Sequence, residues 1–267
     1  MRQLGQMKKS TKNSLFTYTL VIAAFVVVQA LRMGPGVGAM LEGQLIPICA
    51  YIVMALALNL VVGVSGELSL GHAGFMSIGA FAGSALALAL QSTVTLSPLR
   101  LALAMVFGAV IAAALGFLIG IPVLRLNGDY LAIVTLAFGE IIKDLINCLL
   151  VGWDENGLHI ALNVDGTKSM SSLGLSENGI EIIKGAQGAT GNARIATFAM
   201  GFALVMITLV VVLNLVRSRT GRAIMAIRDN RIAAESVGIN VTKYKYLATC
   251  IGSMIAGLGG LYYVMDY

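Results

Sequence analysis

The sequence predicts an all-α, polytopic bundle of about seven transmembrane helices, at least one of them broken. The chain of 267 residues is 58% hydrophobic but only 12% charged, about half the charged fraction of a typical soluble domain. Six stretches of 19 to 32 uncharged residues separate its charged side chains, and about 20 apolar residues in a helix cross a ~30 Å hydrocarbon core. The stretches show no alternation of apolar and polar residues, which favours helices over a closed barrel.

The uncharged stretches place the spans at roughly residues 15–33, 44–63, 70–90, 101–124, 130–151, 196–216 and 246–265. The first span follows a basic segment, as the apolar part of a signal peptide does. Its apolar run is longer than that of a signal, and no clear small-residue cleavage pattern follows it, so we interpret it as retained. The fifth span is the least apolar, because it contains Glu140, Lys143 and Asp144.

The distribution of basic residues predicts the orientation. With the N-terminus inside, the inner segments 1–14, 64–69, 125–129 and 217–245 hold 4, 0, 1 and 7 Lys and Arg, a total of 12, whereas the short outer segments hold only Arg32 and Arg100. Basic residues concentrate in cytoplasmic loops. The sequence therefore predicts a cytoplasmic N-terminus, a cytoplasmic segment at 217–245 and an external loop at 152–195.

Six glycines between Gly63 and Gly83 predict either a broken helix or close helix packing. Glycine weakens a helix and permits close backbone approach, and irregular backbone at membrane depth is tolerated where it is buried or lines a cavity. Small-residue packing of the GxxxG kind is the alternative, most of all at Gly79/Gly83 and Gly116/Gly120.

Two features of the sequence suggest catalytic or metal chemistry, and both are weak. Ser65 lies in a GxSG pattern with His72 seven residues later, and a Ser–His pair supplies nucleophile and base in an intramembrane serine protease. However, that chemistry needs the histidine to face the serine from another helix. The three cysteines lie in apolar runs and match no metal-ligand or disulfide spacing, so we predict no metal site and no cofactor.

The polar loop 152–195 is long enough to meet an external partner, or to be a solvated linker with local order. The segment 217–245 is more informative, because it holds 7 of the 18 basic residues in an amphipathic pattern. Asp229-Asn230 is a plausible N-cap, Arg231 and Glu235 are four residues apart, and Gly238 suits a helix C-terminus. Ile224, Ile227, Ile232 and Ala234 are placed to line apolar faces. We expect two short helices that dock a cytosolic protein, with an interfacial helix on anionic lipid as the alternative.

Three blocks of sequence resemble the permease subunits of ABC importers for branched-chain amino acids, specifically the LivM-type subunit. They are LNLVVGVSGELSLGHAGFMSIGAF at 58–81, LNGDYLAIVTLAFGEII at 126–142, and GRAIMAIRDNRIAAESVGINVTKYKYLA at 221–248 followed by AGLGGLYY at 256–263. Members of this family usually continue beyond the last block with further spans. The resemblance therefore predicts that this chain lacks the family's C-terminal spans.

The resemblance implies one permease domain over 1–267 and a transport subunit, not an enzyme. It implies that 221–238 couples the chain to an ATPase, with Ala233, Ala234, Glu235 and Gly238 matching the family's docking element. Further members of the coupling set are Gly221, Arg222, Arg228 and Asp229. The implied partners are a second permease subunit, cytosolic ATP-binding cassette subunits and an external solute-binding protein, in the plasma (inner) membrane of a prokaryote. The chain itself has no GxxxxGK[ST] motif for ATP.

The candidate translocation path comprises Asn59, Gly71, His72, Thr135 and Glu140. An ionisable side chain within a span is costly and is commonly functional, although Glu140 can also pair locally with Lys143. A zwitterionic amino acid needs one cationic and one anionic contact. Three alternatives remain: a permease for urea or another small polar solute, a non-catalytic scaffold or secondary transporter, and, more distantly, the GxSG protease. The net charge of +5 reflects orientation and docking, so we expect contact with membrane lipid and not with nucleic acid.

Overall fold

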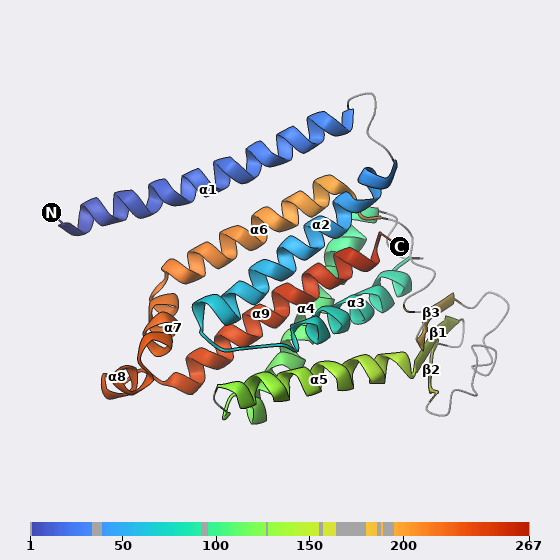
Figure 1. Ribbon diagram of the computed structural model, residues 1–267. Coiled ribbons are helices and arrows are strands. Elements are labelled where there is room, and N and C mark those ends of the chain that lie inside the picture. The colour runs from blue at the N-terminus through green and yellow to red at the C-terminus, as the bar shows by residue number, and fades with distance from the viewer. Residues whose placement is uncertain are drawn as a thin grey trace.

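The computed structural model describes residues 2–33, 39–91, 96–126, 128–154, 157–163, 180–185, 188 and 195–266. The elements follow in the order α1 (Arg2–Met33), α2 (Ala39–Leu58), the π-helix η1 (Asn59–Val64), α3 (His72–Ala89), α4 (Ser97–Val123), α5 (Asp129–Asn147), β1 (Leu149–Asp154), β2 (Gly157–Leu162), β3 (Ile180–Lys184), α6 (Phe198–Arg217), α7 (Arg219–Asp229), α8 (Arg231–Ser236) and α9 (Val241–Val264). The predicted class, a polytopic helical membrane protein, is confirmed (Figure 1).

Six of the seven predicted spans are long and apolar enough to cross a membrane. Among the described residues they are Ser14–Arg32, Gly43–Val64, His72–Ala89, Ser97–Val123, Phe198–Arg217 and Val241–Val264. The predicted span 130–151 differs: its helix α5 ends at Asn147, and Leu149–Asp154 forms β1. Helix α5 is not one of these six helices, because its charged side chains make it less apolar. Conversely, α9 begins at Val241, before the predicted span, where Asn240 caps it. Its Lys245 is buried in an ion pair with Glu67.

The predicted broken helix lies between α2 and α3. α2 continues into η1, and residues 65–71, which we call the break segment, are not helical before α3 begins at His72. Figure 1 shows the break segment leading back along the bundle from the end of η1, so that α3 begins partway along the neighbouring helices. Gly66 has φ 74°, a conformation that favours glycine. The α2–α3 connection therefore contains irregular backbone beside the neighbouring helices.

Helix α9 is the centre of the bundle and contacts α2, α3 and α4. Its buried residues include Gly252, Ser253, Ala256, Gly257, Gly259 and Gly260. A Cβ atom built on Gly79 of α3 would collide with the backbone of Gly257, and one on Gly116 of α4 would collide with Ser253. The GxxxG-type packing expected at Gly79 and Gly116 is thus confirmed, because these helices approach closely enough to exclude a methyl group.

Helix α1 lies at the periphery of the bundle. Its Phe25 ring stacks on Phe198 and Phe202 of α6, with centroid distances of 5.1 and 3.9 Å. These rings, with residues of α2, border an apolar groove of about 290 Å³. Most other large apolar side chains of α1 face outward, as expected for a helix in contact with lipid.

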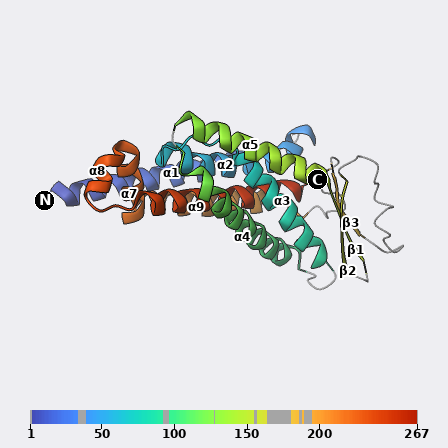
Figure 2. The same ribbon diagram turned by 90° about the horizontal axis from the view of Figure 1, so that it is seen from below.

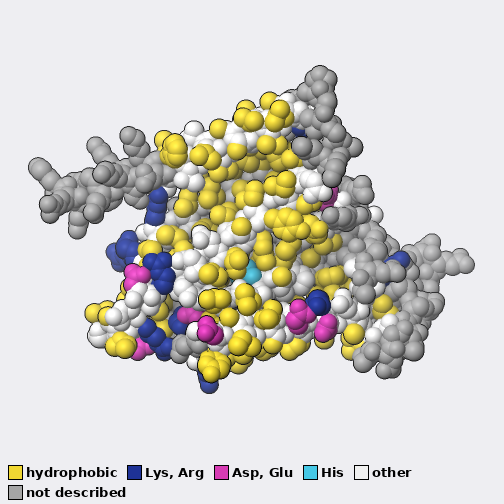
Figure 3. Space-filling view, in the orientation of Figure 1, with side chains coloured by type: hydrophobic (Ala, Val, Ile, Leu, Met, Phe, Trp, Pro, Cys, Tyr) yellow, Lys and Arg dark blue, Asp and Glu magenta, His cyan; other side chains and the backbone are white. Residues whose placement is uncertain are grey.

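The two ends of the bundle carry different structures. The predicted external loop 152–195 contains β-structure: β1 pairs antiparallel with β2 and with β3 in the order β2-β1-β3. Figures 1 and 2 show this sheet at one end, and α7, α8 and the N-terminal end of α1 at the other. Lys and Arg side chains gather towards the α7–α8 end of an otherwise largely hydrophobic face (Figure 3). This arrangement agrees with the charge-based prediction that the N-terminus and 217–245 share a side.

The close approach of α3 and α9 predicts the effect of one methyl group. A Cβ at Gly260 would collide with the Met76 carbonyl oxygen, whereas one at Gly43 would meet no atom within 4 Å. We expect Gly260→Ala to lower the free energy of unfolding by about 1–3 kcal/mol, because overpacking forces the backbones apart. Gly43→Ala, the matched control, should leave it unchanged or slightly raised. Thermal unfolding in detergent measures both, and a Gly260→Ala protein as stable as wild type would contradict this packing.

Candidate functional site

A cavity of about 170 Å³ lies between the start of α3 and the middle of α5. We call it the α3–α5 cavity; its lining residues are Leu70, Gly71, Ala73, Gly74, Ser77, Leu136, Gly139, Glu140 and Lys143. Glu140 and Lys143 form an ion pair, and their side chains are 57% and 59% exposed. The cavity therefore combines small residues, one anionic group and one cationic group. The expected local pairing of Glu140 is thus present, and its place in a translocation path stays a prediction.

The break segment meets α5 at Thr135. The Leu70 backbone N–H donates to Thr135 Oγ1 at 3.1 Å, and that hydroxyl donates to the Ala132 carbonyl oxygen at 2.9 Å. Gly71 packs so closely on the Thr135 backbone that a Cβ could not fit. One hydroxyl thus satisfies a backbone donor of the break segment and fixes its position against α5.

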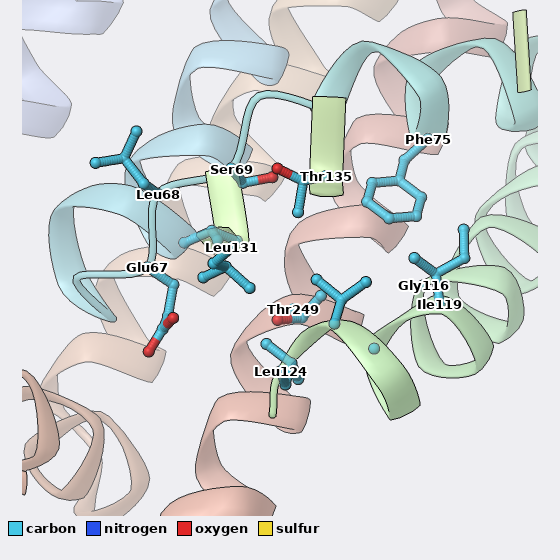
Figure 4. Close-up of a pocket in the computed structure, with 13 residues that line it drawn as sticks. Glu67, Leu68, Ser69, Phe75, Gly116, Ile119, Leu124, Leu131, Thr135 and Thr249 are labelled. Carbon is cyan, nitrogen blue, oxygen red and sulfur yellow. The ribbon is translucent and has the colours of Figure 1, made fainter. Parts of the chain in front are cut away.

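A smaller cavity of about 30 Å³ lies on the other side of this contact. Figure 4 shows its lining, in which Ser69 of the break segment and Thr135 of α5 face Phe75 of α3, Gly116 of α4 and Thr249 of α9. Residues from four helices and the break segment converge here. The break segment therefore has cavities along both of its sides.

The structure brings together three of the five residues predicted for the path. Gly71 and Glu140 line the α3–α5 cavity, and Thr135 holds the segment that contains Gly71. Asn59 is exposed on η1, and its side chain lies over Gly63, away from this cavity. Helical periodicity in the sequence could not show where the Asn59 side chain points, because the π-helix changes the direction of the side chains after Leu58.

His72 is a buried residue of the bundle and does not border the α3–α5 cavity. It is 3% exposed, and its ring makes an edge contact with Phe75 at a centroid distance of 5.9 Å. Within the described chain neither ring nitrogen makes a hydrogen bond; the Gly252 backbone lies close but outside hydrogen-bond geometry.

The described residues do not show the Ser–His pairing that the protease alternative requires. Among the described residues, His72 makes no hydrogen bond to Ser65, although both are buried. The other histidine, His159, lies in β2 at the far end of the bundle. A nucleophile with its base in hydrogen-bond reach is the geometric requirement for such an enzyme.

The predicted pair of short helices at 217–245 is confirmed in detail. Asn230 caps α8, because its Oδ1 accepts from the Ala233 N–H at 3.0 Å. Arg231 Nε lies 3.1 Å from Glu235 Oε1. Gly238 ends α8 with φ 84°, and its N–H donates to the Glu235 carbonyl at 3.0 Å. These caps give the segment 217–245 a fixed structure, as the sequence indicated.

The apolar faces of α7 and α8 differ from the prediction at one position. Ile224, Ile227 and Ala234 are buried as expected, but Ile232 is 80% exposed. Val237 is also 75% exposed. The six-residue helix α8 turns Ala234 inward, so that Ile232 points away from the bundle. Two large apolar side chains are therefore exposed among the charged side chains of this end of the bundle.

The other members of the predicted coupling set are divided between this surface and the bundle. Arg222, Asp229 and Ala233 are exposed. Gly221 is buried in the first turn of α7, where a Cβ would collide with the Leu215 and Val216 carbonyl oxygens. Arg228 reaches back to η1, and its Nη1 donates to the Gly63 carbonyl at 2.8 Å.

Sequence reasoning missed two charged residues that hold the break segment. Lys245 at the start of α9 pairs with Glu67, and the two side chains are only 7% and 12% exposed. Their positions at the edges of two uncharged stretches were a signal of a structural role. Glu67 and Lys245 are 178 positions apart in the sequence. Their pairing depends on how α9 enters the bundle.

The α3–α5 cavity predicts a difference in cysteine reactivity. In a protein whose own three cysteines are replaced, Ala73→Cys lines the cavity, whereas Val106→Cys on α4 is 60% exposed on an apolar helix. A charged, water-soluble thiol reagent should modify Ala73→Cys at least tenfold faster, because charged side chains at this depth require water or a polar surface. Equal rates at both positions would show that the cavity is not hydrated.

Comparisons with known proteins agree with this geometry. Residues 40–267 match the family model described as "Branched-chain amino acid transport system / permease component". The chain is 35% identical over 218 residues to the "High-affinity branched-chain amino acid transport system permease protein LivM" of Salmonella typhimurium, and equally so to that of Escherichia coli. Each match covers 79% of this chain and 49% of the relative.

The chain thus spans about half the length of the curated relatives it matches. No solved structure shows a significant match. The family match extends from α2 to α9 and so includes the break segment, the α3–α5 cavity and the α7–α8 pair. The chain belongs to the family of permease components of branched-chain amino acid transport systems.

Proposed function

We propose that this chain is the membrane-spanning subunit of an ATP-driven importer of branched-chain amino acids. Membership of the permease family supports a transport role. The observation that carries the ATP-driven mechanism is the α7–α8 pair, a capped and ordered surface that presents Ile232 and Val237 at one end of the bundle. Such a surface suits a soluble ATP-binding subunit, which would supply the motor that the chain's own sequence does not encode.

The charged face of α5 supports a second membrane subunit. Glu140 and Lys143 are exposed on the same helix as the exposed apolar residues Tyr130, Ile133 and Ile141. Charged side chains in a span are costly when they face lipid and commonly face a protein interior or a water-filled path. We propose that this side of α5 faces the second permease subunit, with the α3–α5 cavity as this chain's contribution to the path between them.

The same ion pair suits a zwitterionic solute. An amino acid carries one ammonium and one carboxylate, which complement Glu140 and Lys143 respectively. In the present structure these two side chains bind each other. A solute that competes for them changes the relative free energy of two packings of α3 and α5, and that differential binding is what alternating access requires.

The orientation follows from the basic end of the molecule. We propose that the α7–α8 end is cytoplasmic and that the sheet end, with β1–β3, faces the external solute-binding protein (Figures 1 and 3).

Cysteine labelling in spheroplasts tests this orientation. A thiol reagent that cannot penetrate the membrane should label Ile160→Cys in β2 and leave Thr242→Cys at the start of α9 unlabelled. The reverse labelling would invert the orientation.

Uptake by the assembled system tests the function. The chain is reconstituted in vesicles with the second permease, ATP-binding and solute-binding chains of its organism, with ATP on the ATPase side. We expect ATP-dependent accumulation of radiolabelled leucine, isoleucine or valine. Accumulation of urea instead would establish the small-solute alternative, and uptake that continues without the ATP-binding chain would establish a secondary transporter.

The exposed apolar pair predicts where the ATPase binds. Ile232→Glu should lower co-purification of the ATP-binding subunit and ATP-dependent uptake at least tenfold, because a carboxylate replaces a side chain buried in the interface. Thr242→Glu adds the same charge at another exposed position of this end and should change neither. Membrane insertion of both variants serves as the control, and wild-type assembly of Ile232→Glu would contradict the docking surface.

A further inference from the structure

One guanidinium joins α7 to the broken helix. Arg228 Nη1 donates to the Gly63 carbonyl oxygen at 2.8 Å, across 165 positions of sequence. The other edge of the same group, Nε and Nη2, donates to Asp229 Oδ1 at 3.1 and 3.0 Å. The guanidinium is therefore held by its own helix while it binds the end of η1.

The end of η1 receives this donor at a defined point of its hydrogen-bond pattern. The Leu60, Val61 and Val62 carbonyls accept from the backbone N–H groups of Ser65, Glu67 and Gly66 at 3.1, 3.2 and 3.2 Å. The next carbonyl in the series, that of Gly63, accepts from Arg228. A side chain of the coupling helix thus completes the hydrogen bonding of the π-helix, where the break begins.

The aliphatic part of Arg228 fits into a notch made by Gly66. A Cβ on Gly66 would lie 2.5 Å from Arg228 Cγ and 3.2 Å from Cδ. The positive φ of Gly66 turns the chain at the same point. Arg228 is thus in contact with both the last turn of η1 and the first residues of the break segment.

The break segment carries this contact to other helices. Its Glu67 pairs with the buried Lys245 of α9, and its Leu70 N–H binds Thr135 of α5. Gly71, the last residue of the segment, lines the α3–α5 cavity together with Glu140. A continuous series of direct contacts therefore runs from α7, through seven residues of backbone at 65–71, to the charged cavity.

We propose that Arg228 is a positioning residue through which movement of α7 displaces the break segment and changes the α3–α5 cavity. This inference rests on the proposed function, in which an ATP-binding subunit moves α7. It assigns Arg228 to the interior link, and leaves the contact with the ATPase to the outward-facing Ile232 and Val237. The side chain of Arg228 is 40% exposed, with its donors turned to Asp229 and to the bundle.

The first experiment measures the link in the purified chain alone. Arg228→Met keeps the aliphatic stem against Gly66 but removes the donors. Hydrogen exchange of the backbone amides of 63–71 should become at least tenfold faster in this variant, because the end of η1 loses its partner. Arg219→Met removes an exposed arginine from the start of α7 and should leave these rates unchanged. Equal exchange in Arg228→Met and wild type would overturn the proposal.

The second experiment uses the assembled importer. Arg228→Met should retain the ATP-binding subunit and its ATP hydrolysis but lose at least tenfold in solute uptake, whereas Arg219→Met should match wild type in all three. Loss of the ATP-binding subunit from Arg228→Met alone would make Arg228 a docking contact and overturn the proposal, as would wild-type uptake. Arg228→Lys, which keeps the charge and a donor, should lie between Met and wild type in both exchange and uptake, which separates lost bonding from misfolding.

Failure of the proposed function gives a different result. In that case the wild-type assembly shows no ATP-dependent uptake of branched-chain amino acids. The exchange comparison of Arg228→Met with Arg219→Met still decides whether Arg228 holds the break segment.

Discussion

The break between α2 and α3 imposes the requirement that most of the structure meets. Backbone polar groups without partners cost several kcal/mol in apolar surroundings, and the break interrupts the helical pattern that would satisfy them. The molecule supplies backbone partners from two other helices: Thr135 of α5 for the Leu70 N–H, and Arg228 of α7 for the Gly63 carbonyl. Lys245 of α9 pairs with the side chain of Glu67. Hydrogen bonds to charged groups contribute about 1.5–3 kcal/mol, and removing one member of a buried ion pair costs about 3–5 kcal/mol.

Close packing around α9 makes those partners available. In lipid the hydrophobic effect does not drive helices together, so van der Waals contact between small residues determines how closely they approach. Gly79 meets Gly257, Gly116 meets Ser253 and Gly260 meets Met76, with no room for a Cβ. This spacing brings Lys245 within reach of Glu67 and places the break segment between α5 and α9. Gly79, one of the glycines that predict a weak helix, thus also fixes the packing of the bundle.

Two exposed surfaces remain after the bundle has formed, and each suggests a partner. The face of α5 with Glu140 and Lys143 is unsuited to lipid, and α8 presents Ile232 and Val237 where a soluble surface would carry polar groups. The first lies beside the break segment, and the second belongs to the helical pair that Arg228 joins to it. A permease driven by a soluble motor needs this combination of a docking surface, a link and a polar path.

The sequence by itself determined the helical membrane class, six of the seven predicted spans, the position of the break and the caps of α8, because each depends on neighbours within a few residues. Asn230, Gly238 and the Arg231–Glu235 pair could be predicted for that reason. The tertiary structure alone decided that α5 ends before a sheet, that Ile232 faces outward, that Asn59 and His72 lie apart from the α3–α5 cavity, and that Arg228 and Lys245 hold the break segment. Those outcomes join residues far apart in the chain, and their pairing depends on how closely helices rich in small residues approach one another.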